Sequence, residues 1–234
     1  MILVTGYARC GSSSVAYNIG NIYVEAYNDH MIRFDDNNDF RQRVVDAPKE
    51  NRLELIKREG YRGNKDLFPY IEPYIQQLLD DGVMSRIVVL IRNDLFSQVF
   101  SNCMSILMNK WHGDKDFVKR GSVSYIPVDS FNYQLKTCFD YNKKIIKTFK
   151  NVPEAKIFTY EDLFTISERQ CESWEALFSF LNLPFSSKKL FSINQKRYNS
   201  IETMSKIENI SELRQIYSEF IYESLNRSES RIVE

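Results

Sequence analysis

Gly6-Tyr7-Ala8-Arg9-Cys10-Gly11-Ser12-Ser13 is the stretch that decides how the chain begins to fold. It follows an apolar run, Ile2-Leu3-Val4, that predicts a strand, and it leads into residues 11–20, which predict a helix. Glycines at this spacing are typical of a phosphate-binding loop, where backbone N–H groups and the start of a helix point at one oxyanion. The stretch therefore predicts an anion site between the first strand and the first helix.

The residue after the second glycine separates this loop from those that bind nucleoside triphosphates. Such loops have Lys there to reach the β- and γ-phosphates, whereas this chain has Ser12, and its cation is Arg9. ATP is therefore disfavoured as the ligand. Two alternatives stay open for these residues: a tight turn that binds nothing, and for Cys10 either a reactive thiolate near Arg9 or a small residue that fills the loop.

Composition indicates one globular domain over residues 1–234, because 43% hydrophobic residues are enough to form a core without disulfides. The 31 basic and 31 acidic residues balance, so nothing indicates a nucleic-acid partner or an anionic membrane surface. The four cysteines lie far apart, unlike those of a zinc site or a redox dithiol. Without an 18-residue apolar run or a signal peptide, we expect no membrane span and a cytoplasmic location. Abundant Asn, Ile, Lys and Tyr favour a microbial or phage origin.

Short apolar runs alternate with longer amphipathic segments, which predicts an α/β fold with a mostly parallel sheet. The strands expected are residues 2–5, 22–27, 86–91 and 155–159, with a weaker one near 61–66. The helices expected are residues 11–20, 70–81, 94–110, 130–150, 171–182 and 211–227. Residues 35–60 predict an exposed helical insertion, and residues 112–128 predict a long loop. Arg92 follows the apolar run 86–91 at its carboxyl end, where such sheets bind ligands.

Four segments carry a resemblance to a known family. They are the loop itself; Val88-Val89-Leu90-Ile91-Arg92-Asn93-Asp94 followed by Ser101; Ile157-Phe158-Thr159-Tyr160-Glu161-Asp162-Leu163 followed by residues 177–184; and, more weakly, residues 206–213. In this order they resemble the sulfotransferase superfamily, whose members transfer a sulfuryl group from 3′-phosphoadenosine 5′-phosphosulfate (PAPS) to a hydroxyl or amine. The nine-residue step from Arg92 to Ser101 is closer to bacterial trehalose-type and carbohydrate sulfotransferases than to the animal cytosolic enzymes.

The resemblance implies a P-loop-like fold of three layers, with helices on both faces of a central sheet of about five strands. It implies PAPS as the donor, 3′-phosphoadenosine 5′-phosphate (PAP) as the product, no metal, and a carbohydrate or another small hydroxylated acceptor. The donor-binding residues it implies are Gly6, Arg9, Cys10, Gly11, Ser12, Ser13, Arg92, Ser101 and Arg197. Cys10 stands where Ser is usual, and the segment around Arg197 lacks the RKGxxG pattern of the cytosolic enzymes.

Catalysis by this chemistry depends on positioning and on fixed positive charge at the leaving phosphate, for which Arg9 is the candidate. The base that accepts the acceptor's proton is open. Glu25, on the strand expected over residues 22–27, matches the approximate position of the carboxylate in trehalose-type members, and His30 is the next candidate. His112 is a weaker candidate for the base. Lys65 resembles the family's Gly-x-Lys, where it could contact donor or acceptor, and each of these residues could instead be a surface residue.

Two other functions remain open. A nucleotide or small-molecule kinase would depend on ATP and magnesium, and a non-catalytic relic would keep Arg9 and Arg92 without turnover. Glu161 and Asp162 are interpreted as structural, Asp162 as a possible helix N-cap. The sequence gives no indication of the oligomeric state.

Overall fold

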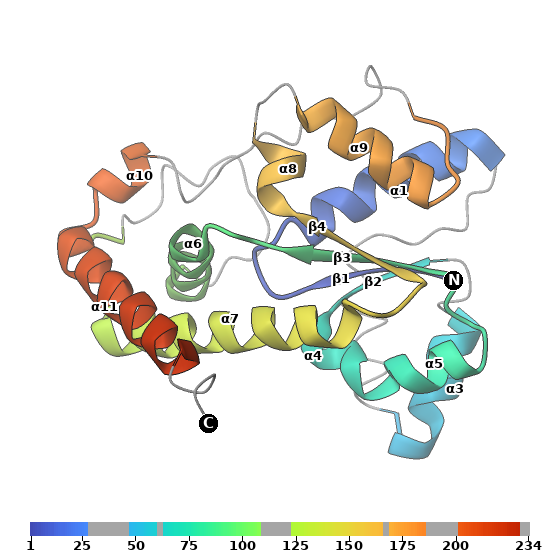
Figure 1. Cartoon of the computed structure of the whole chain (residues 1–234), viewed down its shortest axis with the longest axis horizontal. Coiled ribbons are helices and arrows are strands. Elements are labelled where there is room, and N and C mark those ends of the chain that lie inside the picture. Colours follow the sequence, from blue (N-terminus) through green and yellow to red (C-terminus); the bar gives the residue numbers. More distant parts are fainter. Residues whose placement is uncertain (28–46, 60–62, 109–122, 166–168, 186–200, 230–234) are drawn as a thin grey trace. The chain divides into compact units, whose positions relative to one another are not determined.

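The computed structural model describes residues 1–27, 47–59, 63–108, 123–165, 169–185 and 201–229 (Figure 1). They form two compact units, each made of two parts of the chain. The first unit comprises Met1–Asn93 and Tyr141–Asn194, and the second comprises Asp94–Asp140 and Gln195–Glu234. The expectation of one domain over residues 1–234 stays a prediction.

A parallel sheet forms the centre of the first unit. Its strands lie in the order β2 (Gly63–Leu67), β1 (Ile2–Gly6), β3 (Arg86–Ile91) and β4 (Ala155–Thr159). The α/β class is thus confirmed, and the described residues give four strands where about five were expected. Strands β1 and β3 are the central pair, and Leu3, Val4 and residues 87–90 are completely buried, as expected for strands covered on both faces.

The strand expected over residues 22–27 is wrong, because these residues continue helix α1 (Ser12–Tyr27). Val15, Ala16, Ile19 and Ile22 are buried and recur at helical spacing, so one face of the helix packs on the sheet as far as Ile22. This burial outweighs the strand preference of the β-branched and aromatic residues that follow.

Helices cover both faces of the sheet in the first unit, which gives three layers (Figure 1). Side chains alternate along β1, so that Val4 faces one core and Leu3 faces the other. The core around Val4 includes α1, α8 (Tyr160–Phe164) and α9 (Arg169–Phe180). The core around Leu3 includes α3 (Lys49–Glu59), α4 (Phe68–Ile71), the 3₁₀ turn Glu72–Tyr74, α5 (Ile75–Asp80) and the last part of α7 (Val128–Phe149).

The second unit is helical where the structure describes it. It contains α6 (Leu95–Leu107), the first part of α7, α10 (Ile201–Ser205) and α11 (Ile210–Glu229). The ring of Phe96 on α6 contacts Phe131 on α7 and Tyr217 on α11, with centroids 5.8 and 5.5 Å away. These aromatic contacts join the three helices into a core.

Asn209, in the segment that resembles the family's closing motif, has a structural role in the second unit. Its Nδ2 donates to the carbonyl of Ile126 at 2.9 Å, and its Oδ1 accepts from the Ile126 N–H at 3.2 Å. The amide thus satisfies both backbone groups of a residue just before α7. No helix within the described segments has the length and apolar character needed to cross a membrane.

Candidate anion site

The glycine loop joins β1 to α1 in the first unit. β1 ends at Gly6, α1 begins at Ser12, and the first helical hydrogen bond runs from Val15 N–H to the carbonyl of Gly11 at 3.1 Å. The first N–H groups of a helix have no acceptor within the helix, so the loop and helix start can offer backbone donors to an anion.

Arg9 and Gly11 both have left-handed backbone conformations, with φ values of +65° and +87°. Gly11 adopts such a conformation without cost, whereas Arg9 is strained by roughly 1–3 kcal/mol. Strained residues of this kind are typical of functional loops, where the surrounding structure holds them in place.

Neighbouring atoms leave no room for a side chain at either glycine of the loop. A Cβ atom on Gly6 would lie 2.4 Å from the carbonyl oxygen of Leu90 and 2.6 Å from Sγ of Cys10. A Cβ atom on Gly11 would lie 2.6 Å from the ring of Phe164. The loop is therefore packed directly against the end of β3 and against α8, without room for a side chain at either glycine.

Cys10 fills the loop. Its side chain is fully buried, and burial raises the pKa of its thiol, against the lowering effects of hydrogen bonds with Ser12 and of the nearby Lys65 charge. The thiol is therefore protonated near neutral pH, which favours the filling role over the reactive thiolate. Lys65, half-buried on β2 beside Val4, is close enough for its charge to act on this loop.

Arg92 follows the last residue of β3 and is buried, with 6% of its surface exposed. Its Nη1 donates to the carbonyl of Arg9 in the loop at 3.5 Å, and its guanidinium carbon lies 4.3 Å from the centre of the Tyr160 ring. Its Nε is buried and has no hydrogen-bond partner among the residues that the structure describes. A buried guanidinium with an unused donor fits a site that receives an anion.

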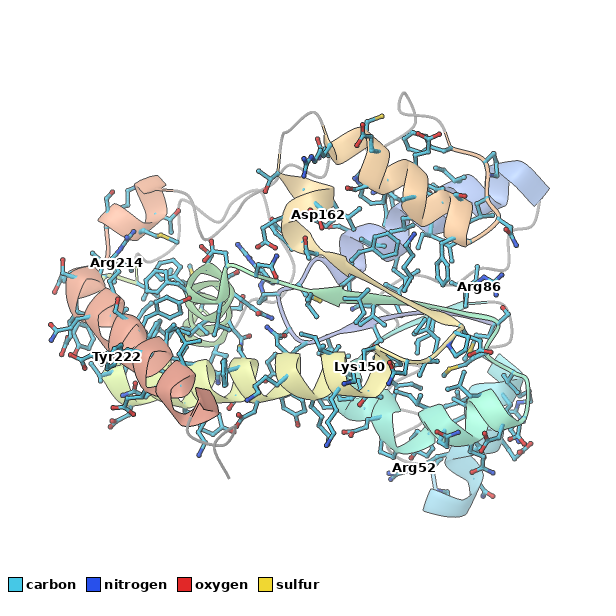
Figure 2. All side chains as sticks on the ribbon, viewed as in Figure 1. Arg52, Arg86, Lys150, Asp162, Arg214 and Tyr222 are labelled. Atoms are coloured by element: carbon cyan, nitrogen blue, oxygen red, sulfur yellow. The ribbon has the colours of Figure 1, made fainter. Side chains whose placement is uncertain are left out.

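Arg86, at the other end of the same strand, provides a contrast. Its Nε donates to the carbonyl of Phe180 at 3.0 Å and its Nη1 donates to the carbonyl of Ser85 at 2.8 Å (Figure 2). Its guanidinium also lies over the ring of Phe180. Arg86 is therefore a structural arginine with backbone acceptors, whereas Arg92 keeps a buried donor without one.

The beginning of α8 adds Glu161 to the site. One carboxylate oxygen lies 3.9 Å from Nε of Arg92, and the other accepts from the N–H of Asn93 at 3.0 Å. The first contact is an ion pair too long to be a hydrogen bond, so Glu161 compensates the charge of Arg92 without using its Nε donor.

Asp162 does not cap α8 as its N-cap residue, which is a correction to the sequence interpretation. Thr159 occupies that position, and its Oγ1 accepts from the N–H of Asp162 at 3.1 Å. Asp162 stands at the third helical position (Figure 2), where its Oδ2 accepts from Thr159 Oγ1 at 2.6 Å. The pair fixes the first turn of α8, which carries Tyr160 and Glu161.

The structure brings the loop residues and Arg92 together in the first unit. Ser101 lies on α6 in the second unit. Glu25 lies in α1, thirteen residues after Ser12, which at a rise of about 1.5 Å per residue puts its backbone roughly 20 Å along the helix from the loop. His30, His112 and Arg197 lie outside the described residues.

Ser101 belongs to a polar side of α6 that is buried rather than exposed. This side, at helical spacing, consists of Ser97, Gln98, Ser101, Asn102 and Ser105. Asn102 Nδ2 donates to Oε1 of Gln134 on α7 at 2.6 Å, and Ser105 Oγ donates to the Ser101 carbonyl at 2.8 Å. The side chain of Ser101 therefore lies on a buried polar side of α6.

Tyr160 and Glu161 are the site residues that sequence reasoning missed. The signal that could have found them is register: β3 and β4 run parallel with Ile91 opposite Thr159, so the residues after each strand, Arg92 and Tyr160, are neighbours. The register between a strand that ends at Ile91 and one that begins at Ala155 cannot be counted from one sequence, because the long connection between them does not fix it.

Comparison with known proteins adds no family assignment, because no protein-family model matches the chain and no curated protein matches it either. Among the described residues, no group of three or more His, Cys, Asp or Glu side chains is arranged to hold a metal ion.

Proposed function

We propose that this protein is a sulfotransferase that moves a sulfuryl group from PAPS to a hydroxyl of a carbohydrate or another small metabolite. One observation carries the proposal: the buried guanidinium of Arg92 lies beside the glycine loop and keeps a donor without a partner among the described residues. The loop and Arg92 are two adjacent groups suited to anions, and PAPS carries a 5′-phosphosulfate and a 3′-phosphate.

The loop supports a site for the phosphosulfate. Backbone N–H groups at the start of α1 and the hydroxyls of Ser12 and Ser13 would hold the 5′-phosphate, and Arg9 would balance the charge that develops on the leaving oxygen. Arg92 would bind the 3′-phosphate. Ser101 and Arg197 stay predictions for the same phosphate, taken from the family resemblance.

The reaction is an in-line displacement at sulfur. The acceptor oxygen forms a bond to sulfur while the bond between sulfur and the 5′-phosphate oxygen breaks, and that oxygen keeps the electron pair as PAP leaves. The hydroxyl proton passes to a base. The reason for choosing Glu25 as the base no longer holds, because Glu25 lies on helix α1 rather than on a strand that ends at the sheet edge. His30 remains a prediction.

Calorimetric titration with PAP and with ATP plus magnesium tests the proposal, using Arg92→Ala and the matched control Arg86→Ala. We expect PAP to bind, Arg92→Ala to lose about 10- to 100-fold in PAP affinity, and Arg86→Ala to keep PAP affinity. A screen of PAPS with neutral sugars would then identify the acceptor.

The two other functions give different results in the same titration. Binding of ATP with magnesium in preference to PAP would replace the proposal with a kinase. Binding of neither nucleotide would replace it with a non-catalytic module. Equal losses of PAP affinity in Arg92→Ala and Arg86→Ala would remove the observation that carries the proposal, since Arg86 lies at the opposite end of β3.

A further inference from the structure

Tyr160 contacts both parts of the candidate site. Its ring lies beneath the guanidinium of Arg92, with 4.3 Å between the guanidinium carbon and the ring centre. On the loop side, a Cβ atom on Gly11 would lie 3.1 Å from Cδ2 of the same ring. One aromatic ring therefore lies against both the glycine loop and the strand-end arginine.

Aromatic residues of α8 and α9 support the Tyr160 ring. It packs against Phe164 one turn later, with centroids 4.9 Å apart, and Phe164 meets Trp174 of α9 edge to face at 5.8 Å. Trp174 Nε1 also donates to the carbonyl of Leu163 at 2.8 Å. Because this helix turn is tied to the core of the unit, the ring cannot yield without moving α8.

The Tyr160 ring supports the guanidinium of Arg92 from one side, and the N–H groups at the edge of the guanidinium can still donate hydrogen bonds. The Nη1 donor reaches the carbonyl of Arg9 in the loop, while Nε has no hydrogen-bond partner within the described part of the chain. The absence of a side chain at Gly11 lets the loop backbone approach the ring that orients Arg92. The position of Arg92 relative to the loop thus depends on its direct contact with Arg9 and on the ring that lies against both Arg92 and Gly11.

We infer that Tyr160 is a positioning residue that couples the two anion subsites, so that the site selects a nucleotide with two separated phosphate groups over one with a single phosphate. This inference rests on the proposed function. A ligand that bridges two subsites held at a fixed spacing gains from both at once, whereas a monophosphate gains from one. If the spacing is loose, part of that advantage is lost.

The test compares the affinities of PAP, 5′-AMP and 3′-AMP for the wild-type protein, Tyr160→Leu and the control Tyr160→Phe, measured by calorimetry. We expect Tyr160→Leu to lower PAP affinity about 10-fold while each monophosphate changes by no more than about twofold, and Tyr160→Phe to retain the wild-type ratios. Tyr160→Met is measured in parallel, because its flexible side chain fills similar space without a ring and keeps the protein folded if Leu does not.

The ratio of PAP affinity to 5′-AMP affinity is the readout that a general structural role would not change. If the Leu and Met variants bind PAP and keep the wild-type ratio, the coupling is overturned and the proposed function stands. If all three nucleotides weaken by the same factor, Tyr160 only supports the fold and the coupling is again overturned. If the wild-type protein does not bind PAP, the proposed function itself fails, and the coupling with it.

Discussion

Glu161 and Arg92 form an ion pair at the carboxyl edge of the sheet, with 3.9 Å between a carboxylate oxygen and Nε. The carboxylate uses its other oxygen to hold the backbone N–H of Asn93, the residue directly after Arg92. Since 5% of the Arg92 side chain is exposed, Glu161 balances a cation that water cannot reach freely. The same carboxylate is also a competitor of any anion that approaches Arg92.

Replacing Glu161 should separate these two effects. Glu161→Ala should lower the free energy of unfolding by about 1–3 kcal/mol, because the Asn93 N–H and the Arg92 charge both lose a partner. Glu161→Gln should lose less of the free energy of unfolding, since its amide oxygen can still accept from the N–H of Asn93. The affinity of Glu161→Gln for PAP should not fall. Urea unfolding and calorimetry measure the two quantities, with Glu175→Gln on the exposed side of α9 as the control. Weaker PAP binding in Glu161→Gln would contradict the competition.

Two substitutions of Arg9 should separate the strain of its backbone from the role of its side chain in sulfuryl transfer. Arg9→Gly and Arg9→Ala both remove the guanidinium, but only Gly adopts the φ value of +65° without strain. We expect Arg9→Gly to be more stable than Arg9→Ala by about 1 kcal/mol in thermal unfolding, and both to lose sulfuryl transfer from PAPS. Equal stability of the two variants would show that this backbone conformation carries no strain.

Gly11 and Gly82 form a matched pair for testing how tightly the loop is packed. Both have positive φ, +87° and +65°, but a Cβ atom on Gly82 would meet no atom within 4 Å, whereas one on Gly11 would meet two aromatic rings. Gly82→Ala should lower the free energy of unfolding by about 1 kcal/mol, which is the cost of a side chain on a residue with positive φ. Gly11→Ala should cost about 1–3 kcal/mol more in chemical unfolding, because α8 must move. Similar losses in both variants would argue against close packing of α8 on the loop.

Cysteine reactivity should distinguish the filling role of Cys10 from a thiolate. Cys171 is exposed, whereas Cys10, Cys103 and Cys138 are buried. At pH 8, iodoacetamide should modify Cys171 first, and Cys10 should react only after unfolding, as followed by mass spectrometry of peptides. Rapid modification of Cys10 in the folded protein would restore the thiolate interpretation.

Cys103 should make stability fall at alkaline pH. Burial raises the pKa of its thiol to about 12, so the folded state keeps a proton that the unfolded state releases from about pH 8.5. The unfolded state therefore binds fewer protons, and the free energy of unfolding should fall as pH rises through this window. Cys103→Ala should show a shallower decline between about pH 9 and 11 in urea titrations, whatever its stability at pH 7. An unchanged slope would exclude this thiol as the cause.

Much of the first unit could be predicted because its signals are local. The run 155–159 coincides with β4, and the loop with its flanking strand and helix follows from glycine spacing and apolar runs within a few residues. The end of α1 could not be predicted in the same way. Ile22-Tyr23-Val24 has strand-forming residues, and only burial of one face against the sheet makes it helical.

The candidate site could be predicted from the sequence where it contains charged residues. Arg92 stands out because it ends an apolar run, and Arg9 because it lies between the glycines. Tyr160 and Glu161 gave no such signal, because their role depends on neighbours brought close by strand pairing. For Cys10 the sequence left a thiolate and a loop-filling residue open, and the choice between them depends on burial and on packing against Gly6, which no local pattern records.

The pairing of Ile91 with Thr159 means that the site is encoded by strand length as much as by residue identity. Inserting one residue between Phe158 and Thr159 would leave every side chain of the chain present, yet it would shift the ladder and place Thr159 where Tyr160 now meets Arg92. A genetic screen for insertions should therefore find this point intolerant even to small residues, and a designer who transplants the site to another sheet must copy the stagger of its strands before copying the arginine.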